Sequence, residues 1–143
     1  MITTKLKTIL TDSGCTLVLY ESSQLANLLT DQSKPNDIIG LILQPNDVTK
    51  EIKANAIHNH YPPIRIEILK QSRLEDPAEN NETILELLDG IVDKIIMGLI
   101  ASGDFKKITS FTVTKILETR YDANVIGWSM PLDLYYLENK NCL

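Results

Sequence analysis

The chain has 143 residues, of which 43% are hydrophobic and 23% are charged, and its formal net charge is −5. This length fits one domain that folds without a metal or a disulfide, and the composition excludes a globally disordered chain. The negative charge, without any basic stripe, argues against duplex nucleic acid as the main ligand. The sequence has no apolar run as long as a membrane span and no signal-peptide pattern at Met1–Lys7, so we expect a protein made in the cytoplasm.

The two cysteines, Cys15 and Cys142, are far apart and form no CxxC pair. Cys15 begins an apolar run, where a free thiol behaves as a small buried hydrophobe. Cys142 is one residue from the end of the sequence. We therefore expect a reduced, intracellular protein.

The first third of the chain predicts a helix, a strand and a shorter helix. Apolar residues at helical spacing, followed by Gly14, predict a helix over residues 2–13. The β-branched and aromatic run 15–20 predicts a strand. A serine then caps a short helix that carries three leucines, and residues 33–37 form a turn cluster.

The middle of the chain predicts two strands that are separated by a long polar excursion. The run 38–43 is apolar on both faces and is ended by Pro45. Residues 46–62 are polar and without a regular pattern, which indicates a long loop of the kind that often carries function. The alternating run 64–68 predicts a strand with one face in water.

The strongest element is a long helix over residues 81–103, ended by Gly103. A wide apolar stripe runs along it, and most of its charged residues lie off that stripe. The stripe consists of Ile84, Leu87, Leu88, Ile91, Val92, Ile95, Ile96, Leu99 and Ile100. We expect this helix to pack along a sheet.

The C-terminal part predicts two strands, of which the last has the clearer pattern. An alternating stretch around Phe111 and Val113 predicts the first. In the last strand one face carries Trp128, Met130, Leu132, Leu134 and Tyr136. The other face carries Ser129, Pro131, Asp133 and Tyr135. Pro131 lacks an N–H, which favours an edge strand or a bulge at that point.

The element order predicts an α+β fold. We expect a mostly antiparallel or mixed sheet of about five strands, with the long helix and the shorter N-terminal helix packed on one face. Residues 1–143 are expected to form a single domain with the polar excursion at 46–62.

The string His58-Asn59-His60 is the clearest candidate for a metal site. Two histidines at i and i+2 can reach a metal from an extended segment, which raises the alternative of a small metal-dependent nuclease. Zinc takes three or four ligands, and no third ligand is near in the sequence. We therefore interpret both histidines as solvated loop residues and assign no metal site.

Carboxylates supply no convincing acid–base pair. Glu86, Asp89 and Asp93 lie on one side of the long helix, but catalysis needs one carboxylate in an apolar pocket and another in water. The remaining candidates are isolated in the sequence: Asp104, Asp122 and Asp133. Phosphate-loop, dinucleotide, nucleophile-elbow and zinc-protease motifs are absent from the sequence. We assign no catalytic or cofactor-binding residue and expect no enzyme activity and no cofactor.

Two aromatic groups leave alternatives open. Tyr61-Pro62-Pro63 and Tyr135-Tyr136 are of a kind that is enriched at interface cores. Equally, Tyr136 belongs to the core face of the last strand while Tyr135 covers an edge of the sheet.

The most distinctive family pattern lies in residues 121–134, YDANVIGWSMPLDL, where a turn leads into a final apolar strand. The stretch FTVTKI at 111–116, the 81–103 helix and a cysteine near the end belong to the same pattern. In these features most of the chain resembles the tail terminator (tail-completion) proteins of long-tailed bacteriophages. The resemblance implies no catalytic residues.

The resemblance implies a homo-hexameric ring in the tail–neck region of a virion, assembled in the host cytoplasm. Such a ring caps the tail tube, ends its polymerisation and docks to head-side neck proteins, while DNA passes through without specific binding. A strand edge and a helix flank supply the two unlike surfaces that a ring needs, and an acidic balance suits its lumen. The 46–62 excursion is expected to reach a neighbouring subunit or the tube.

Two alternatives stay open. One is another head–tail neck component, such as a joining or stopper protein. The other, from a different class, is the metal-dependent nuclease that uses His58 and His60.

Overall fold

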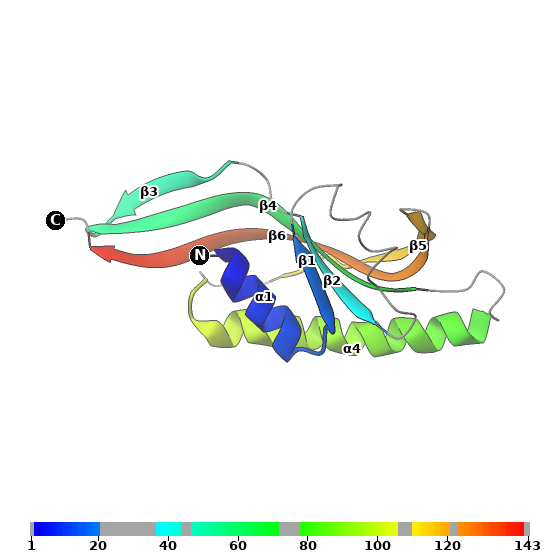
Figure 1. Ribbon diagram of the computed structural model, residues 1–143. Coiled ribbons are helices and arrows are strands. Elements are labelled where there is room, and N and C mark those ends of the chain that lie inside the picture. Colours follow the sequence, from blue (N-terminus) through cyan, green and yellow to red (C-terminus); the bar gives the residue numbers. More distant parts are fainter. Residues whose placement is uncertain are drawn as a thin grey trace.

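A computed structural model describes residues 2–20, 37–43, 47–71, 78–105, 110–120 and 123–141. These residues form an α+β fold, as predicted, with two helices and a six-stranded sheet (Figure 1). The elements in chain order are α1 (Ile2–Asp12), β1 (Leu17–Tyr20), β2 (Ile38–Leu43), β3 (Thr49–Lys53), β4 (Ala56–Gln71), α4 (Ala78–Ser102), β5 (Thr114–Arg120) and β6 (Ala123–Asn141).

The sheet is mixed and mostly antiparallel. Its strand order is β1-β2-β4-β6-β5, and β3 pairs with β4 outside this path. Only β1 and β2 run parallel among the described pairs. The predicted short helix and residues 33–36 of the turn cluster lie between these two strands, outside the described residues.

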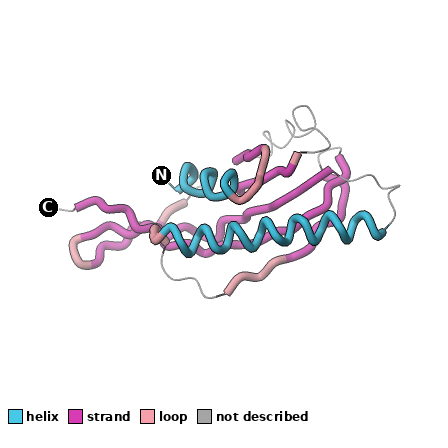
Figure 2. Tube along the Cα trace, turned by 90° about the horizontal axis from the view of Figure 1, so that it is seen from below, coloured by secondary structure: helices cyan, strands magenta, loops and turns pink. Residues whose placement is uncertain are grey.

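Both helices cover the same face of the sheet, as predicted, and Figure 2 shows α4 lying along the strands with α1 beside it. We call this the helix face. The main core lies between the helices and this face, and its fully buried members include Leu6, Leu10, Ile64, Leu88 and Ile95. A smaller apolar cluster on the opposite face contains Ile39, Leu69, Ile116 and Val125. The two clusters explain why β2 is apolar on both sides.

The end of α1 follows from one glycine. Gly14 has a φ of 120°, which favours a residue without a Cβ. The N–H of Cys15 donates to the carbonyl of Leu10 at 3.1 Å, and the N–H of Gly14 donates to that of Thr11 at 3.2 Å. This is the bonding pattern of a Schellman motif, and it places Cys15 in the core.

The long helix is confirmed, but part of its predicted apolar stripe is not buried. Leu88, Val92 and Ile95 pack in the core with the neighbouring stripe residues, and Gly103, with a φ of 68°, ends the helix. Leu87 and Ile100 are instead exposed. The predicted stripe was wider than the arc of a helix that one sheet covers, so its two flanks face away from the core.

The predicted loop at 46–62 is wrong, because most of this segment forms strands. β3 and the start of β4 make a hairpin whose two turn residues, Ala54 and Asn55, have φ values of 51° and 61°. Two left-handed residues in a two-residue loop are the geometry of a type I′ turn, which matches the twist of paired strands. β3 therefore adds one strand to the predicted five.

The hairpin and the end of β6 form an extension that we call the ribbon: β3, residues 56–61 of β4 and residues 134–141 of β6. Figure 1 shows the ribbon projecting past the C-terminal end of α4, away from the end where α4 begins. The helix-covered sheet and the ribbon are thus made from the same two long strands.

Pro131 lies where β6 changes its surroundings. The first half of β6 lies between β4 and β5, and its last pair with β5 joins Ser129 to Thr114. At Pro131 the only described neighbour strand is β4, which has a bulge between Tyr61 and Ile64. The edge or bulge predicted from the missing N–H is therefore present.

Candidate functional site

The two histidines lie on one face of β4 inside the ribbon, not in a loop. Nε2 of His60 is 2.6 Å from Oδ1 of Asp133, a residue of β6. Nδ1 of His58 is buried and has no hydrogen-bond partner. Their alternation with Asn59, which is buried on the helix face, follows from the strand geometry.

This arrangement offers few of the metal ligands that a metal-dependent nuclease needs. Among the described residues there is no group of three or more His, Cys, Asp or Glu side chains that could hold a metal ion. Two imidazoles and one exposed carboxylate fall short of a catalytic zinc set, which needs three protein ligands and an open position. The nuclease alternative therefore rests on the histidines alone.

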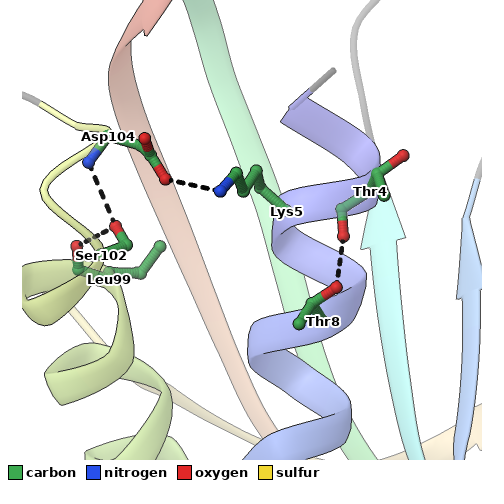
Figure 3. A network of polar contacts seen from close by, with 6 residues as sticks. All are labelled: Thr4, Lys5, Thr8, Leu99, Ser102 and Asp104. Carbon is green, nitrogen blue, oxygen red and sulfur yellow. Dashed lines mark hydrogen bonds and ion pairs between the residues drawn. The ribbon is translucent and has the colours of Figure 1, made fainter.

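Two of the three aspartates that are isolated in the sequence, Asp104 and Asp133, have partners in the structure. Asp104 pairs with Lys5 at 3.0 Å, which joins the end of α4 to α1 (Figure 3). Its own N–H donates to the hydroxyl of Ser102, which in turn donates to the carbonyl of Leu99 at 2.9 Å. Asp133 pairs with His60. Asp122 lies outside the described residues, as does Cys142.

Cys15 is buried, as predicted, with 4% of its surface exposed. Burial penalises the thiolate and raises the pKa of the thiol to about 12. A thiol with this pKa stays protonated at neutral pH and is neither a nucleophile nor a metal ligand. Its role is packing.

A polar cluster on the opposite face of the sheet corrects one prediction. The alternating run of β4 was expected to keep one face in water, and Arg65 is indeed exposed. Glu67, however, is only 1% exposed. It pairs in register with Ser129 of β6, whose hydroxyl accepts a 2.8 Å hydrogen bond from Arg65. Strands on both sides of β4 cover this position, which a pattern within one strand cannot reveal.

A groove lies between the N-terminal half of α4 and the helix face of β6. It has a volume of about 290 Å³. Its lining is one aromatic, one aliphatic and three acidic residues: Trp128, Leu85, Glu82, Glu86 and Asp89. The indole N–H of Trp128 donates to the main-chain carbonyl of Leu85 at 3.0 Å, which fixes the ring against the helix.

No ion pair within the described chain neutralises the acidic residues of the groove. None of the three acidic residues, Glu82, Glu86 and Asp89, makes an ion pair with a described residue. Lys115 is the cross-strand partner of Trp128 in the register, yet it also makes no ion pair with them. Like charges three or four residues apart on a helix destabilise it, typically by about 0.2–0.5 kcal/mol a pair.

Towards the C-terminal end of α4, the same flank of the helix becomes apolar. Asp93 continues the acidic line by one turn, and Met97 and Ile100 follow at helical spacing. Met97 is 63% exposed, and Ile100 is exposed as well. Met97 and Ile100 thus add two exposed apolar side chains to the flank that carries the acidic residues.

The ribbon differs from the acidic groove because it presents a cation beside an exposed aliphatic side chain. Ile52 of β3 is 73% exposed, and it lies on the helix face together with Lys50. Nζ of Lys50 is 3.1 Å from the side-chain oxygen of Asn59, a neutral partner. On the other face of β3, Lys53 pairs with Glu51 at 3.3 Å. The helix face of the ribbon therefore combines an exposed aliphatic side chain with a cation that no described carboxylate neutralises.

Of the two aromatic groups, Tyr61-Pro62-Pro63 and Tyr135-Tyr136, the structure describes the side chain of Tyr61 alone. Tyr61 is buried in the main core at the base of the ribbon. Of Tyr135 and Tyr136, only the main chain is described, in pairing with β4.

Sequence reasoning placed Glu86 and Asp89 on one side of the helix but missed the groove. Its aromatic wall comes from a residue 43 positions away from Leu85, and no local pattern signals that contact. None of the described helices is both long and apolar enough to cross a bilayer. No protein-family model, curated protein or solved structure matches the chain.

Proposed function

We propose that this chain is a virion structural protein that forms a homo-hexameric ring, in the manner of the tail terminators that its sequence resembles. The ring caps the tail tube, ends its polymerisation and docks to the head-side neck proteins. Assembly takes place in the host cytoplasm, and no residue has a catalytic role.

The observation that carries the proposal is the presence of two exposed surfaces of unlike chemistry at opposite ends of the molecule. One is the ribbon with Ile52 and Lys50, and the other is the flank of α4 with its acidic groove. A ring requires head-to-tail contacts in which different surfaces of neighbouring subunits meet. A protein with only one adhesive patch forms a two-fold dimer instead.

The charge of the chain supports the same proposal. A net charge of −5 keeps the subunit soluble and gives it no affinity for the phosphates of passing DNA. A protein that lines a passage for DNA benefits from this lack of affinity.

The direct test is the size and shape of the purified protein. Light scattering over a range of concentrations and negative-stain microscopy should give six-subunit rings, alone or after addition of tail tube protein. A strict monomer under both conditions contradicts the proposal. Tubes that stop growing at a defined length when this protein is added support the terminator activity itself.

The second candidate, a joining or stopper protein of the neck, uses the same two surfaces. Its discriminating feature is the partner. Co-purification with the tail tube supports the terminator, whereas co-purification with the portal complex and not the tube supports the neck component.

A further inference from the structure

We propose that the ribbon of one subunit docks on the flank of α4 of the next, with Lys50 bound by Glu82 and Glu86 and Ile52 packed on Leu85 and Trp128. This inference rests on the proposed self-assembly and names the surfaces that carry it. The occupant of the groove is thus a second copy of this chain.

The acidic row is better explained by a cationic partner than by the helix itself. Anionic side chains near a helix N-terminus are stabilised by the helix dipole, but only within about the first turn. α4 begins at Ala78, so Glu86 and Asp89 lie beyond that turn. No ion pair within the described chain offsets their mutual repulsion, and a bound ammonium group does so.

The shape of the groove fits a side chain, not a polymer. Its volume of about 290 Å³ accommodates the ends of one or two side chains. An indole ring beside carboxylates attracts an ammonium group through its face as well as through charge. Leu85 and Trp128 offer apolar contact next to the charges. The groove therefore suits a partner that has both a cation and an apolar side chain.

The ribbon supplies both properties on one face of one strand. Lys50 and Ile52 are two residues apart on one face of a strand, a separation of about 6.5–7 Å. Glu82 and Glu86 are one helical turn apart, so one ammonium group can lie between their carboxylates. Leu85 and Trp128 line the same groove beside them. The cation and the aliphatic side chain can therefore contact the acidic and apolar parts of the groove together.

The contact cannot form within one chain. The ribbon projects past the C-terminal end of α4, whereas the groove lies along the N-terminal half of the same helix (Figure 1). The two surfaces therefore meet only between molecules, and each molecule offers one of each. Met97 and Ile100, further along the flank, extend the contact beyond the groove.

Charge reversal in the full chain tests this contact. Lys50→Glu and Glu86→Lys should each weaken self-association at least about tenfold by mass photometry, since close interfacial charge pairs contribute well over 1 kcal/mol. The double variant exchanges the two charges and should recover association to within about threefold of wild type. Lys7→Glu and Asp12→Lys, exposed residues of α1, are the matched controls and should leave association unchanged.

Cross-linking tests the head-to-tail geometry in a Cys142→Ser background. A mixture of Ile52→Cys and Leu85→Cys chains should form a covalent heterodimer with a short bismaleimide, and neither variant should do so alone. Circular dichroism of each variant verifies folding.

The outcomes separate this contact from the proposed function. If all charge variants still form rings or still co-purify with the tube, the proposed contact is wrong and the proposed function stands. A link between two Ile52→Cys chains overturns it in favour of a ribbon-to-ribbon dimer. A chain that neither associates nor cross-links at any concentration, alone or with tail tube protein, overturns both.

Discussion

The helix-covered sheet and the ribbon share the two long strands β4 and β6, yet they differ in how far their side chains are buried. Under α1 and α4 the helix-face residues of β4 are buried, as at Ile64 and Ile66. In the ribbon Ile52 lies in solvent, although Tyr61 at the base of the ribbon is still part of the main core. The helices, and not the strands, decide where the core ends. The covered part therefore carries stability, and the ribbon is available for association.

The largest expected effect lies in the covered sheet, at Gly127. A Cβ at this position would overlap the main-chain carbonyl oxygen of Ile68 on β4, and backbone cannot move aside cheaply. Gly127→Ala should destabilise the fold by about 4 kcal/mol or more, measured by urea unfolding followed by circular dichroism. Gly90→Ala is the control, because a Cβ there meets nothing within 4 Å and should stabilise α4 by about 0.5–1 kcal/mol. Equal effects at both glycines would contradict the packing described.

The next largest effect on the unfolding free energy is expected at a buried isoleucine of α4, compared with an exposed isoleucine of the ribbon. Ile95 of α4 is fully buried, so Ile95→Ala should cost about 2–5 kcal/mol of unfolding free energy. Ile52→Ala in the ribbon should change it by less than about 0.5 kcal/mol, because its side chain is already in water. If Ile52→Ala proves as destabilising as Ile95→Ala, the ribbon belongs to the core after all.

Burial of Cys15 makes the unfolding free energy of the protein depend on pH. Its pKa is raised by burial from 9.0 to about 12, so above pH 9 the unfolded chain loses a proton that the folded chain retains. Unfolding free energy should therefore fall between pH 9 and pH 12 by up to about 1.4 kcal/mol per pH unit from this group. The difference between wild type and Cys15→Ala in urea unfolding at pH 8 and pH 11 isolates the effect. A constant difference across that range is the contrary result.

The smallest effect concerns the ribbon turn. Ala54 has a left-handed φ of 51°, which costs a residue with a Cβ about 1 kcal/mol. Replacing Ala54-Asn55 by Asn-Gly, the preferred type I′ pair, should raise hydrogen-exchange protection of the β3 amides several-fold. Amides of α4 should keep their protection, and a rise there instead would show that the turn controls the whole fold.

The sequence predicted the elements whose burial is periodic. α4 and the Trp128–Leu132 part of β6 repeat apolar residues at 3.6 and 2.0 positions because each has one buried face. β3 escaped prediction because Thr49–Lys53 is exposed on nearly every side and its turn contains no glycine. The pattern also cannot tell a buried flank from an exposed one, so Leu87 and Ile100 were assigned to the core.

Of the candidate site, only the chemistry of the individual residues was visible in the sequence. Glu86 and Asp89 were recognised as one side of a helix, but the wall that turns them into a groove comes from Trp128. Lys50 and Ile52 were part of a segment that showed no pattern. Contacts between distant segments depend on sheet register and helix placement, which a single sequence does not encode locally.

The position of β6 in the sheet has a consequence for how the protein is made. β6 follows every other described element in the chain, yet it lies between β4 and β5 and pairs with both. During synthesis the apolar strands β2 and β4 emerge long before the strand that completes the sheet, so they remain exposed to other nascent chains in the meantime. Pairing between strands so distant in the chain is also slow to form. Folding therefore waits for the last strand, and the unfinished chain is most prone to aggregation just before it emerges.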